Sequence, residues 1–216
     1  SYVLLEEIGR GANGVVFRAK HEALEREVAL KVLLGCDAEG LARFQLEAKA
    51  MSRIVHPGVV SVFDIGVSRG HPYYVMELCE GETLRDLIAR KRLGIGEAVS
   101  LVRGLAEAVA VAHEAGVIHR DLKPANVLLA KNTNQVRITD FGLARDERVQ
   151  RMTRTGDVLG TPVYMAPEQA GGRKDLDGRI DVYALGVILY ECLSGRPPYL
   201  EASWLAMRQA IMNGKP

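Results

Sequence analysis

The chain has 216 residues, of which 48% are hydrophobic and 25% charged, a balance typical of a globular protein. Its formal net charge of +1 indicates no overall field that would attract nucleic acid or an anionic membrane surface. The three cysteines lie far apart without a CxxC pair, which argues against a disulfide framework and favours a reducing, cytoplasmic compartment. No apolar run approaches the ~20 residues that span a bilayer, so we expect no membrane segment within this chain. A membrane anchor outside it remains compatible with the sequence.

The first third of the chain predicts a small sheet with one helix, over residues 1–76. Four valine-rich and leucine-rich runs are expected to form strands: Val15–Lys20, Glu27–Leu33, Val59–Val67 and Tyr73–Met76. The first two are close enough to form a hairpin. Between the second and third runs, apolar residues recur at helical spacing at Leu41, Phe44, Met51 and Ile54. Asp37 is a candidate N-cap of this helix, and His56-Pro57-Gly58 is expected to end it.

The remaining residues predict a mainly helical region. The segment Gly96–Ala115 carries a stripe of apolar residues, and Gly116 after it is a plausible C-terminal glycine. Gly104 inside this segment costs about 1 kcal/mol relative to alanine, so tertiary packing must hold the helix. Arg179–Leu193 is almost entirely apolar after Asp181, which predicts a helix buried on most sides. Residues 77–82 are the expected connector between the sheet and the helical region.

A glycine-rich segment, Gly9-Arg10-Gly11-Ala12-Asn13-Gly14, fits the pattern GxGxxG. In a dinucleotide-binding turn the glycines open a helix, whereas here a strand-like run follows them. A glycine hairpin between two strands instead lets backbone N–H groups approach phosphates closely. A plain hairpin turn is the alternative interpretation of this segment by itself.

Lys31 follows on the next predicted strand, in Val28-Ala29-Leu30-Lys31. A lysine in such a strand is often a solvated outward residue. A buried lysine must be paired, because an isolated ammonium in an apolar cleft is costly. Glu47, in the predicted helix, is the nearest suitable carboxylate, and phosphate oxygens are a second possible partner.

The most specific pattern is His119-Arg120-Asp121-Leu122-Lys123-Pro124-Ala125-Asn126, followed fourteen residues later by Asp140-Phe141-Gly142. Asn126 and Asp140 supply the hard oxygen donors that Mg²⁺ prefers alongside nucleotide phosphates. A further carboxylate, that of Asp121, is then available to interact with a hydroxyl group that accepts the phosphoryl group. Each string alone is an ordinary loop or turn, but their order and spacing together make coincidence negligible.

In these motifs the sequence resembles a eukaryotic-type serine/threonine protein kinase, over residues from Tyr2 to about Tyr199. The phrase from Gly160 to Gln169 resembles the bacterial branch most. The resemblance implies an α+β, two-lobed kinase fold, with a small antiparallel-sheet N-lobe (1–76), a hinge (77–82) and a mainly helical C-lobe (83–216). It also implies further helices after the last residue of this chain, including an arginine that pairs with Glu168, so the fold is expected to be truncated at its C-terminus.

The resemblance also implies which residues bind ATP. Glycines 9, 11 and 14 would cover the triphosphate, and Lys31 would hold its α and β phosphates while pairing with Glu47. Met76 would lie at the back of the nucleotide pocket, with backbone groups of Glu77 and Cys79 bonding the adenine edge. The adenine would be sandwiched by apolar side chains, with one of them beneath it: Ile8, Val16, Ala29 and Leu128.

For catalysis, the resemblance assigns Asp121 to accept and orient the substrate hydroxyl, and Lys123 to neutralise charge on the γ-phosphoryl group. Asn126 and Asp140 would hold Mg²⁺. His119 is expected to be a packed structural residue rather than a base or ligand. Asp181, at the head of the apolar helix, would brace the catalytic loop by similarity rather than react.

The polar segment between Asp140 and Glu168 contains Thr153 and Thr155, which we expect to be autophosphorylated. Arg120 precedes Asp121, and a cation there can bind a phosphate; relatives with that arginine are typically switched on by loop phosphorylation. Such modification of one molecule by another would require at least a transient dimer. Without Arg120, a disordered surface loop would be the default interpretation. Thr161 resembles the residue that shapes the substrate pocket.

Two rival functions remain open at this point. A pseudokinase, which binds nucleotide or partner proteins without catalysis, would lack at least one of four residues that are all present: Lys31, Asp121, Asn126 and Asp140. A small-molecule kinase of related fold would lack the long threonine-bearing loop that ends in Ala166-Pro167-Glu168. We therefore expect protein substrates, ATP and Mg²⁺, and no nucleic-acid partner.

Overall fold

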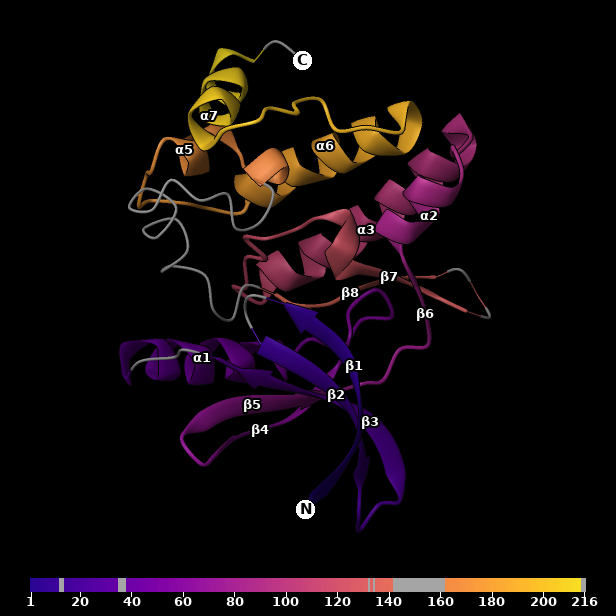
Figure 1. Ribbon diagram of the computed structural model, residues 1–216, viewed down its shortest axis with the longest axis vertical. Coiled ribbons are helices and arrows are strands. Elements are labelled where there is room, and N and C mark those ends of the chain that lie inside the picture. Colours follow the sequence, from indigo (N-terminus) through magenta and orange to yellow (C-terminus); the bar gives the residue numbers. More distant parts are fainter. Residues whose placement is uncertain (12–13, 35–37, 132, 134, 142–161, 215–216) are drawn as a thin grey trace.

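The computed structural model of the chain describes residues 1–11, 14–34, 38–131, 133, 135–141 and 162–214. An antiparallel sheet with one helix lies at one end of the molecule, and the long helices lie at the other (Figure 1). The catalytic-loop residues lie between these two parts. The architecture therefore has the two-lobed arrangement expected from the sequence.

The N-terminal lobe is built on a five-stranded antiparallel sheet in the order β1-β2-β3-β5-β4. Its strands are β1 (Tyr2–Gly11), β2 (Gly14–His21), β3 (Arg26–Leu33), β4 (Val62–Ser68) and β5 (His71–Met76). The expected hairpin of β2 and β3 is confirmed. Its first residue, Gly14, has φ 151°, and a Cβ there would collide with the carbonyl oxygen of Val32, so the position requires glycine.

Three details of this lobe differ from expectation. Strand β1 covers all of Tyr2–Gly11, a segment without a clear two-residue alternation in the sequence, and most of its side chains are exposed. Helix α1 (Ala38–Met51) ends before Ile54, although Ile54 is buried in the core. The strand expected from Val59 begins only at Val62; Val59 instead forms a parallel bridge to Ile138.

Two long helices organise the C-terminal lobe, α3 (Ile95–Glu114) and α6 (Arg179–Ser194), close to the expected segments. Gly104 of α3 lies against Val136, and a Cβ at this position would be only 3.1 Å from Val136 Cγ2. Its missing side chain thus allows the close packing that the sequence argument required. Gly116 adopts φ 77° directly after α3, as expected for a C-terminal glycine.

Several shorter elements complete the fold, and most of them had no clear sequence signal. A three-stranded sheet has the order β6-β7-β8. These elements are β6 (Gly81–Thr83), α2 (Leu84–Arg90), β7 (Val127–Ala130), β8 (Val136–Ile138), α5 (Pro167–Ala170) and α7 (Trp204–Asn213). The small strands β7 and β8 flank the catalytic segments, because β7 follows Asn126 and β8 precedes Asp140.

A single apolar cluster connects the two lobes. It includes Ala29 and Met76 from the sheet, Leu122 from the catalytic loop, Phe141 and Ile188 of α6. Continuous packing of this kind fixes the relative positions of the groups that the two lobes contribute to the site between them. Within the described residues, no helix is both long and apolar enough to cross a membrane.

Candidate active site

The loop that begins at His119 is held by Asp181, the third residue of α6. Asp181 is only 1% exposed, and its carboxylate accepts hydrogen bonds from the backbone N–H groups of His119 (2.8 Å) and Arg120 (2.9 Å). Its Oδ2 also lies 2.8 Å from Nε2 of His113, on α3. Arg120 has φ 63°, a conformation that is costly for a residue with a side chain. These bonds compensate for that cost, as expected for a residue that braces the loop.

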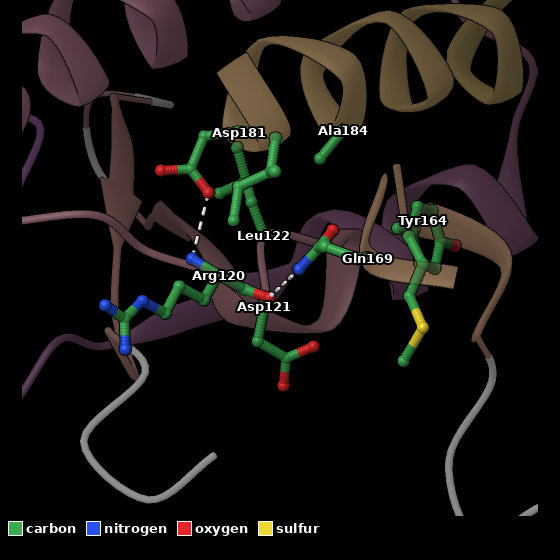
Figure 2. A pocket seen from close by; sticks show the side chains of 9 residues that line it. Arg120, Asp121, Leu122, Tyr164, Gln169, Asp181 and Ala184 are labelled. Carbon is green, nitrogen blue, oxygen red and sulfur yellow. Dashed lines mark hydrogen bonds between the residues drawn. The ribbon is translucent and has the colours of Figure 1, made fainter. Parts of the chain in front are cut away.

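Gln169 of α5 supports the same loop from the other side (Figure 2). Its Nε2 donates a hydrogen bond to the carbonyl oxygen of Arg120 (3.2 Å), and its Oε1 accepts one from the N–H of Ala166 (3.0 Å). A small pocket between the loop and α6 is lined by Gln169, Asp181 and their neighbours. Both backbone polar groups of Arg120 are therefore bonded to buried side chains.

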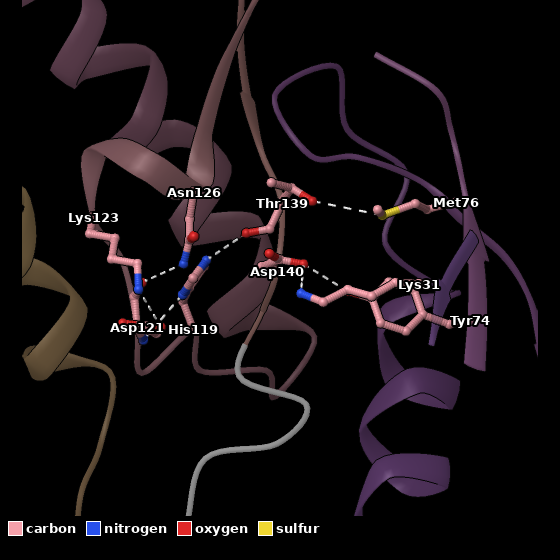
Figure 3. A network of polar contacts seen from close by, with 9 residues as sticks. All are labelled: Lys31, Tyr74, Met76, His119, Asp121, Lys123, Asn126, Thr139 and Asp140. Atoms are coloured by element: carbon pink, nitrogen blue, oxygen red, sulfur yellow. Dashed lines mark hydrogen bonds and ion pairs between the residues drawn. The ribbon is translucent and has the colours of Figure 1, made fainter. Parts of the chain in front are cut away.

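Asp121, Lys123 and Asn126 converge at the end of this loop (Figure 3). Lys123 Nζ lies 3.0 Å from Asp121 Oδ2. Asn126 is buried, and its Nδ2 donates to the backbone carbonyl oxygen of Asp121 (2.8 Å). This bond fixes the orientation of the Asn126 amide, so that its Oδ1 is the atom left as a metal ligand.

Lys31 and Asp140 form an ion pair across the boundary between the lobes. Lys31 is 6% exposed, and its Nζ lies 2.5 Å from Asp140 Oδ1. The same oxygen accepts a hydrogen bond from the hydroxyl of Tyr74 (2.8 Å). Burial alone would raise the pKa of Asp140, but the ammonium of Lys31 and the Tyr74 hydroxyl outweigh it and hold that pKa below its usual value. Asp140 is therefore charged at neutral pH.

His119 connects the catalytic loop to the segment that contains Asp140. It is fully buried, and its Nε2 lies 3.1 Å from the carbonyl oxygen of Thr139, so Nε2 carries the proton. Nδ1 accepts a hydrogen bond from the N–H of Asp121 (3.2 Å), and the ring packs against Phe141 with centroids 4.6 Å apart. Burial lowers the pKa of His119, so the ring is neutral and structural, in agreement with the sequence interpretation.

Acidification is expected to destabilise the fold through His119. Because its pKa is lowered in the folded state, its contribution is complete above about pH 6.5 and is lost as the pH falls toward the folded-state value. The free energy of unfolding should fall by up to about 1.4 kcal/mol per pH unit in that window. Urea denaturation between pH 7.5 and 5.5 measures this slope. His119→Phe keeps an aromatic ring but removes the titratable nitrogen, so the stability of this variant should depend less on pH. An equal dependence in the variant and the parent would contradict the role given to His119.

The apolar residues expected around the adenine are mostly brought together. Ala29 and Met76 are direct cross-strand partners on β3 and β5, and both belong to the core cluster against which Val16 and Leu128 pack. Ile8, on β1, is 46% exposed. Both lobes thus contribute apolar side chains to this cluster, and their role as walls of a nucleotide pocket stays a prediction.

Two hinge residues, Glu77 and Cys79, are the ones expected to contact the adenine edge through their backbone groups. The Glu77 N–H donates to the carbonyl oxygen of Ser61 (3.0 Å), so any contact of a ligand with the Glu77 backbone must use its carbonyl oxygen. Cys79 is partly buried, which raises the pKa of its thiol. The Glu77 carboxylate pairs with Arg137 of β8 at 2.8 Å, which ties the hinge to the C-terminal lobe.

Some expected site residues lie outside the described part of the chain. These are the side chain of Glu47 and the residues Asp37, Thr153, Thr155 and Thr161. Among the described residues, the carboxylate that lies against Lys31 is that of Asp140. The pairing of Lys31 with Glu47 stays a prediction.

Sequence reasoning missed Tyr74 and Arg137, which both contact expected site residues. Tyr74 reads as one more apolar residue of a buried strand, and Arg137 as a solvated charge. The only available signal for Tyr74 was its register, since the β3–β5 pairing places it directly opposite Lys31. That register depends on the folded sheet.

The residues present fit Mg²⁺. Asn126 Oδ1 and the Asp140 carboxylate are hard oxygen donors, and among the described residues no hydrogen bond reaches Asn126 Oδ1 or Asp140 Oδ2. No cluster of three or more His, Cys, Asp or Glu side chains suited to a metal occurs in the described part. Two protein ligands are nevertheless sufficient for a cation that keeps its remaining coordination for water and phosphate oxygens.

Comparison with known proteins agrees with this geometry. The family model for the protein kinase domain matches residues 2–214. The serine/threonine-protein kinase pkn2 of Myxococcus xanthus is 42% identical over 204 residues, covering 91% of this chain and 24% of that protein. PknL of Mycobacterium tuberculosis is 40% identical over 210 residues, covering 95% of this chain and 52% of that protein. The chain thus spans between about a quarter and about half the length of these relatives.

The fold is also found among solved structures. The crystal structure of a double mutant of the Mycobacterium tuberculosis PknI kinase domain aligns with a TM-score of 0.78 at 31% identity. The alignment covers 92% of this chain and 75% of that one. The two-lobed α+β fold expected from the motifs is therefore confirmed, and the chain belongs to the protein kinase domain family, among relatives that are bacterial serine/threonine kinases.

Proposed function

We propose that this chain transfers the γ-phosphoryl group of ATP, with Mg²⁺, to serine or threonine hydroxyls of proteins. The observation that carries the proposal is the convergence of Asp121, Lys123, Asn126 and the Lys31–Asp140 pair at the boundary between the lobes. A pseudokinase would not be expected to keep all of these groups. The names of the bacterial relatives support the choice of serine and threonine as acceptors.

Asp121 would orient the acceptor hydroxyl and take its proton as the new bond forms. A carboxylate is a weak base, so the main contribution of Asp121 is orientation. Lys123, 3.0 Å from Asp121, would neutralise charge on the transferred group. The short contact between the two side chains supports a shared position beside the reacting atoms.

Asn126 and Asp140 would hold Mg²⁺, which neutralises and orients the phosphate oxygens when it is bound. Lys31 would bind the α and β phosphates, which requires its ammonium to exchange the Asp140 carboxylate for phosphate oxygens. The glycines 9, 11 and 14 would cover the triphosphate. Ile8, Val16, Ala29, Met76 and Leu128 would enclose the adenine, with the backbone of Glu77 and Cys79 at its edge.

We also infer that Thr153 and Thr155 are autophosphorylated, by one molecule acting on another in a transient dimer. The clustered Thr153-Arg154-Thr155 and the presence of Arg120 next to the catalytic aspartate support this inference. A phosphate near Arg120 would add charge-assisted hydrogen bonds to a loop that Asp181 already holds.

Incubation of the purified chain with Mg-ATP is expected to add phosphate, seen as steps in intact mass. Phosphopeptide mapping should place the phosphate on Thr153 or Thr155, and Thr153→Ala/Thr155→Ala should lose most of it. A sample with EDTA is the control and should gain nothing. Mapping of phosphate only elsewhere would contradict the assigned threonines. A chain that ADP stabilises in melting experiments, but that phosphorylates neither itself nor a generic basic protein, would contradict the proposed transfer and favour a nucleotide-binding module.

A further inference from the structure

Tyr74 places a hydroxyl against a magnesium ligand from an unusual position, the middle of a buried strand. The residue is 3% exposed, and its ring lies beside Phe44 of α1 with centroids 6.2 Å apart. A tyrosine hydroxyl in such surroundings requires a hydrogen-bond partner, because an unpaired buried hydroxyl is costly. Its partner is Asp140 Oδ1, at 2.8 Å.

Lys31 and Tyr74 act on the same oxygen of Asp140 (Figure 3). The two residues are cross-strand partners, so their side chains leave the same face of the sheet. Among the described residues, the second oxygen of Asp140, Oδ2, accepts no hydrogen bond. The Asp140 carboxylate is therefore held through Oδ1, and Oδ2 is the oxygen that can bind a metal.

Lys31 and Tyr74 differ in whether they can stay bonded to Asp140 when a nucleotide binds. Lys31 carries a mobile charge that phosphate oxygens attract, and its transfer to a nucleotide removes one bond from Asp140. Tyr74 has no charge, and its ring is fixed by packing against Phe44, so its hydroxyl stays in place. Hydrogen bonds from outside the metal's own ligands orient a ligating carboxylate and commonly change metal affinity by tenfold or more.

We propose that Tyr74 is a positioning residue for magnesium: its hydroxyl holds Asp140 Oδ1, so that Oδ2 stays available to the metal after Lys31 moves to the phosphates. The proposal rests on the proposed function. It predicts that Tyr74 influences the Mg²⁺ requirement of nucleotide binding, whereas a purely structural hydroxyl would influence only the stability of the fold.

The test measures the melting temperature of the purified chain at fixed ADP while Mg²⁺ is varied. Tyr74→Phe keeps the ring and removes the hydroxyl, and we expect about tenfold more Mg²⁺ to be needed for half of the ADP-dependent rise in melting temperature. Tyr73→Phe is the matched control, one residue earlier in the same strand, where neighbouring side chains point to opposite faces; its midpoint should equal that of the parent. Phosphoryl transfer by Tyr74→Phe should recover to within about twofold of the parent at saturating Mg²⁺.

An Mg²⁺ midpoint of Tyr74→Phe equal to that of the parent would overturn this proposal alone. Absence of any Mg²⁺-dependent ADP effect in the parent would overturn it together with the proposed function. Tyr74→Met, which also lacks the hydroxyl, is measured in parallel so that the result does not depend on a single variant being folded. An equal rise of the midpoint in both variants would support the proposal.

Discussion

Asp121→Asn is expected to slow phosphoryl transfer by about 1,000-fold while leaving nucleotide binding intact. Asparagine keeps the size of the side chain but removes the negative charge that orients the hydroxyl and accepts its proton, a contribution typically of 10²- to 10⁴-fold. The residues assigned to ATP and Mg²⁺, Lys31, Asn126 and Asp140, are unchanged. Single-turnover incorporation of phosphate, followed by intact mass, measures the loss.

The same variant separates catalysis from folding. Its melting temperature should still rise with Mg²⁺ and ADP by about as much as that of the parent. The variant loses the charge interaction with Lys123, and such a partly exposed pair contributes only about 1 kcal/mol or less. Asp175→Asn, an exposed carboxylate paired with Arg173, removes the same charge elsewhere and should not change transfer. Transfer by Asp121→Asn within tenfold of the parent would exclude Asp121 as the catalytic residue.

Asp181→Asn is expected to lower the free energy of unfolding by about 3 kcal/mol and to slow transfer by at least about 100-fold. The carboxylate accepts from two backbone N–H groups and also contacts His113. An amide has one acceptor oxygen, so at least one buried N–H would face another donor. Each such loss costs about 1–3 kcal/mol. Urea denaturation at pH 7.5 measures the stability change.

The loss of activity in Asp181→Asn should exceed what unfolding explains. Arg120 is held at φ 63° by these bonds, and its release would displace Asp121, the next residue. Misplacement by about 1 Å is enough to reduce catalysis by roughly 100-fold. Asp177→Asn is the matched control, because Asp177 precedes the same helix but is exposed, and among the described residues its carboxylate accepts hydrogen bonds only from Arg179. A folded Asp181→Asn variant with the activity of the parent would contradict the bracing role.

These two predictions concern one continuous set of contacts. Asp181 holds His119 and Arg120, His119 bonds Thr139, and Thr139 precedes Asp140, which binds Lys31 and Tyr74. The groups assigned to the acceptor hydroxyl and to the metal are therefore positioned by the same buried framework. A change in α6 can therefore reach the N-terminal lobe through buried, hydrogen-bonded side chains.

The sequence by itself determined the parts of the fold that rest on local pattern. The apolar runs of β2, β3, β5 and α6 and the helical spacing in α1 and α3 were recognisable, because each depends on the burial of residues that are near one another in the chain. The short strands β7 and β8 were not, since three or four residues carry too little pattern to separate a strand from a loop. The bounds of the exposed strand β1, which the glycine hairpin implies, were not predicted, because its side chains do not alternate between core and solvent.

For the candidate site, the sequence predicted which residues take part, and only the tertiary structure decided which side chains they contact. Asp121, Lys123, Asn126 and Asp140 were recognisable from order and spacing, because a reaction constrains residue types. The opposition of Lys31 and Tyr74 depends on strand register, and the reach of both to Asp140 depends on packing between the lobes. Hydrogen bonds between residues 66 and 109 positions apart leave no mark in local sequence, since only the folded chain brings them together.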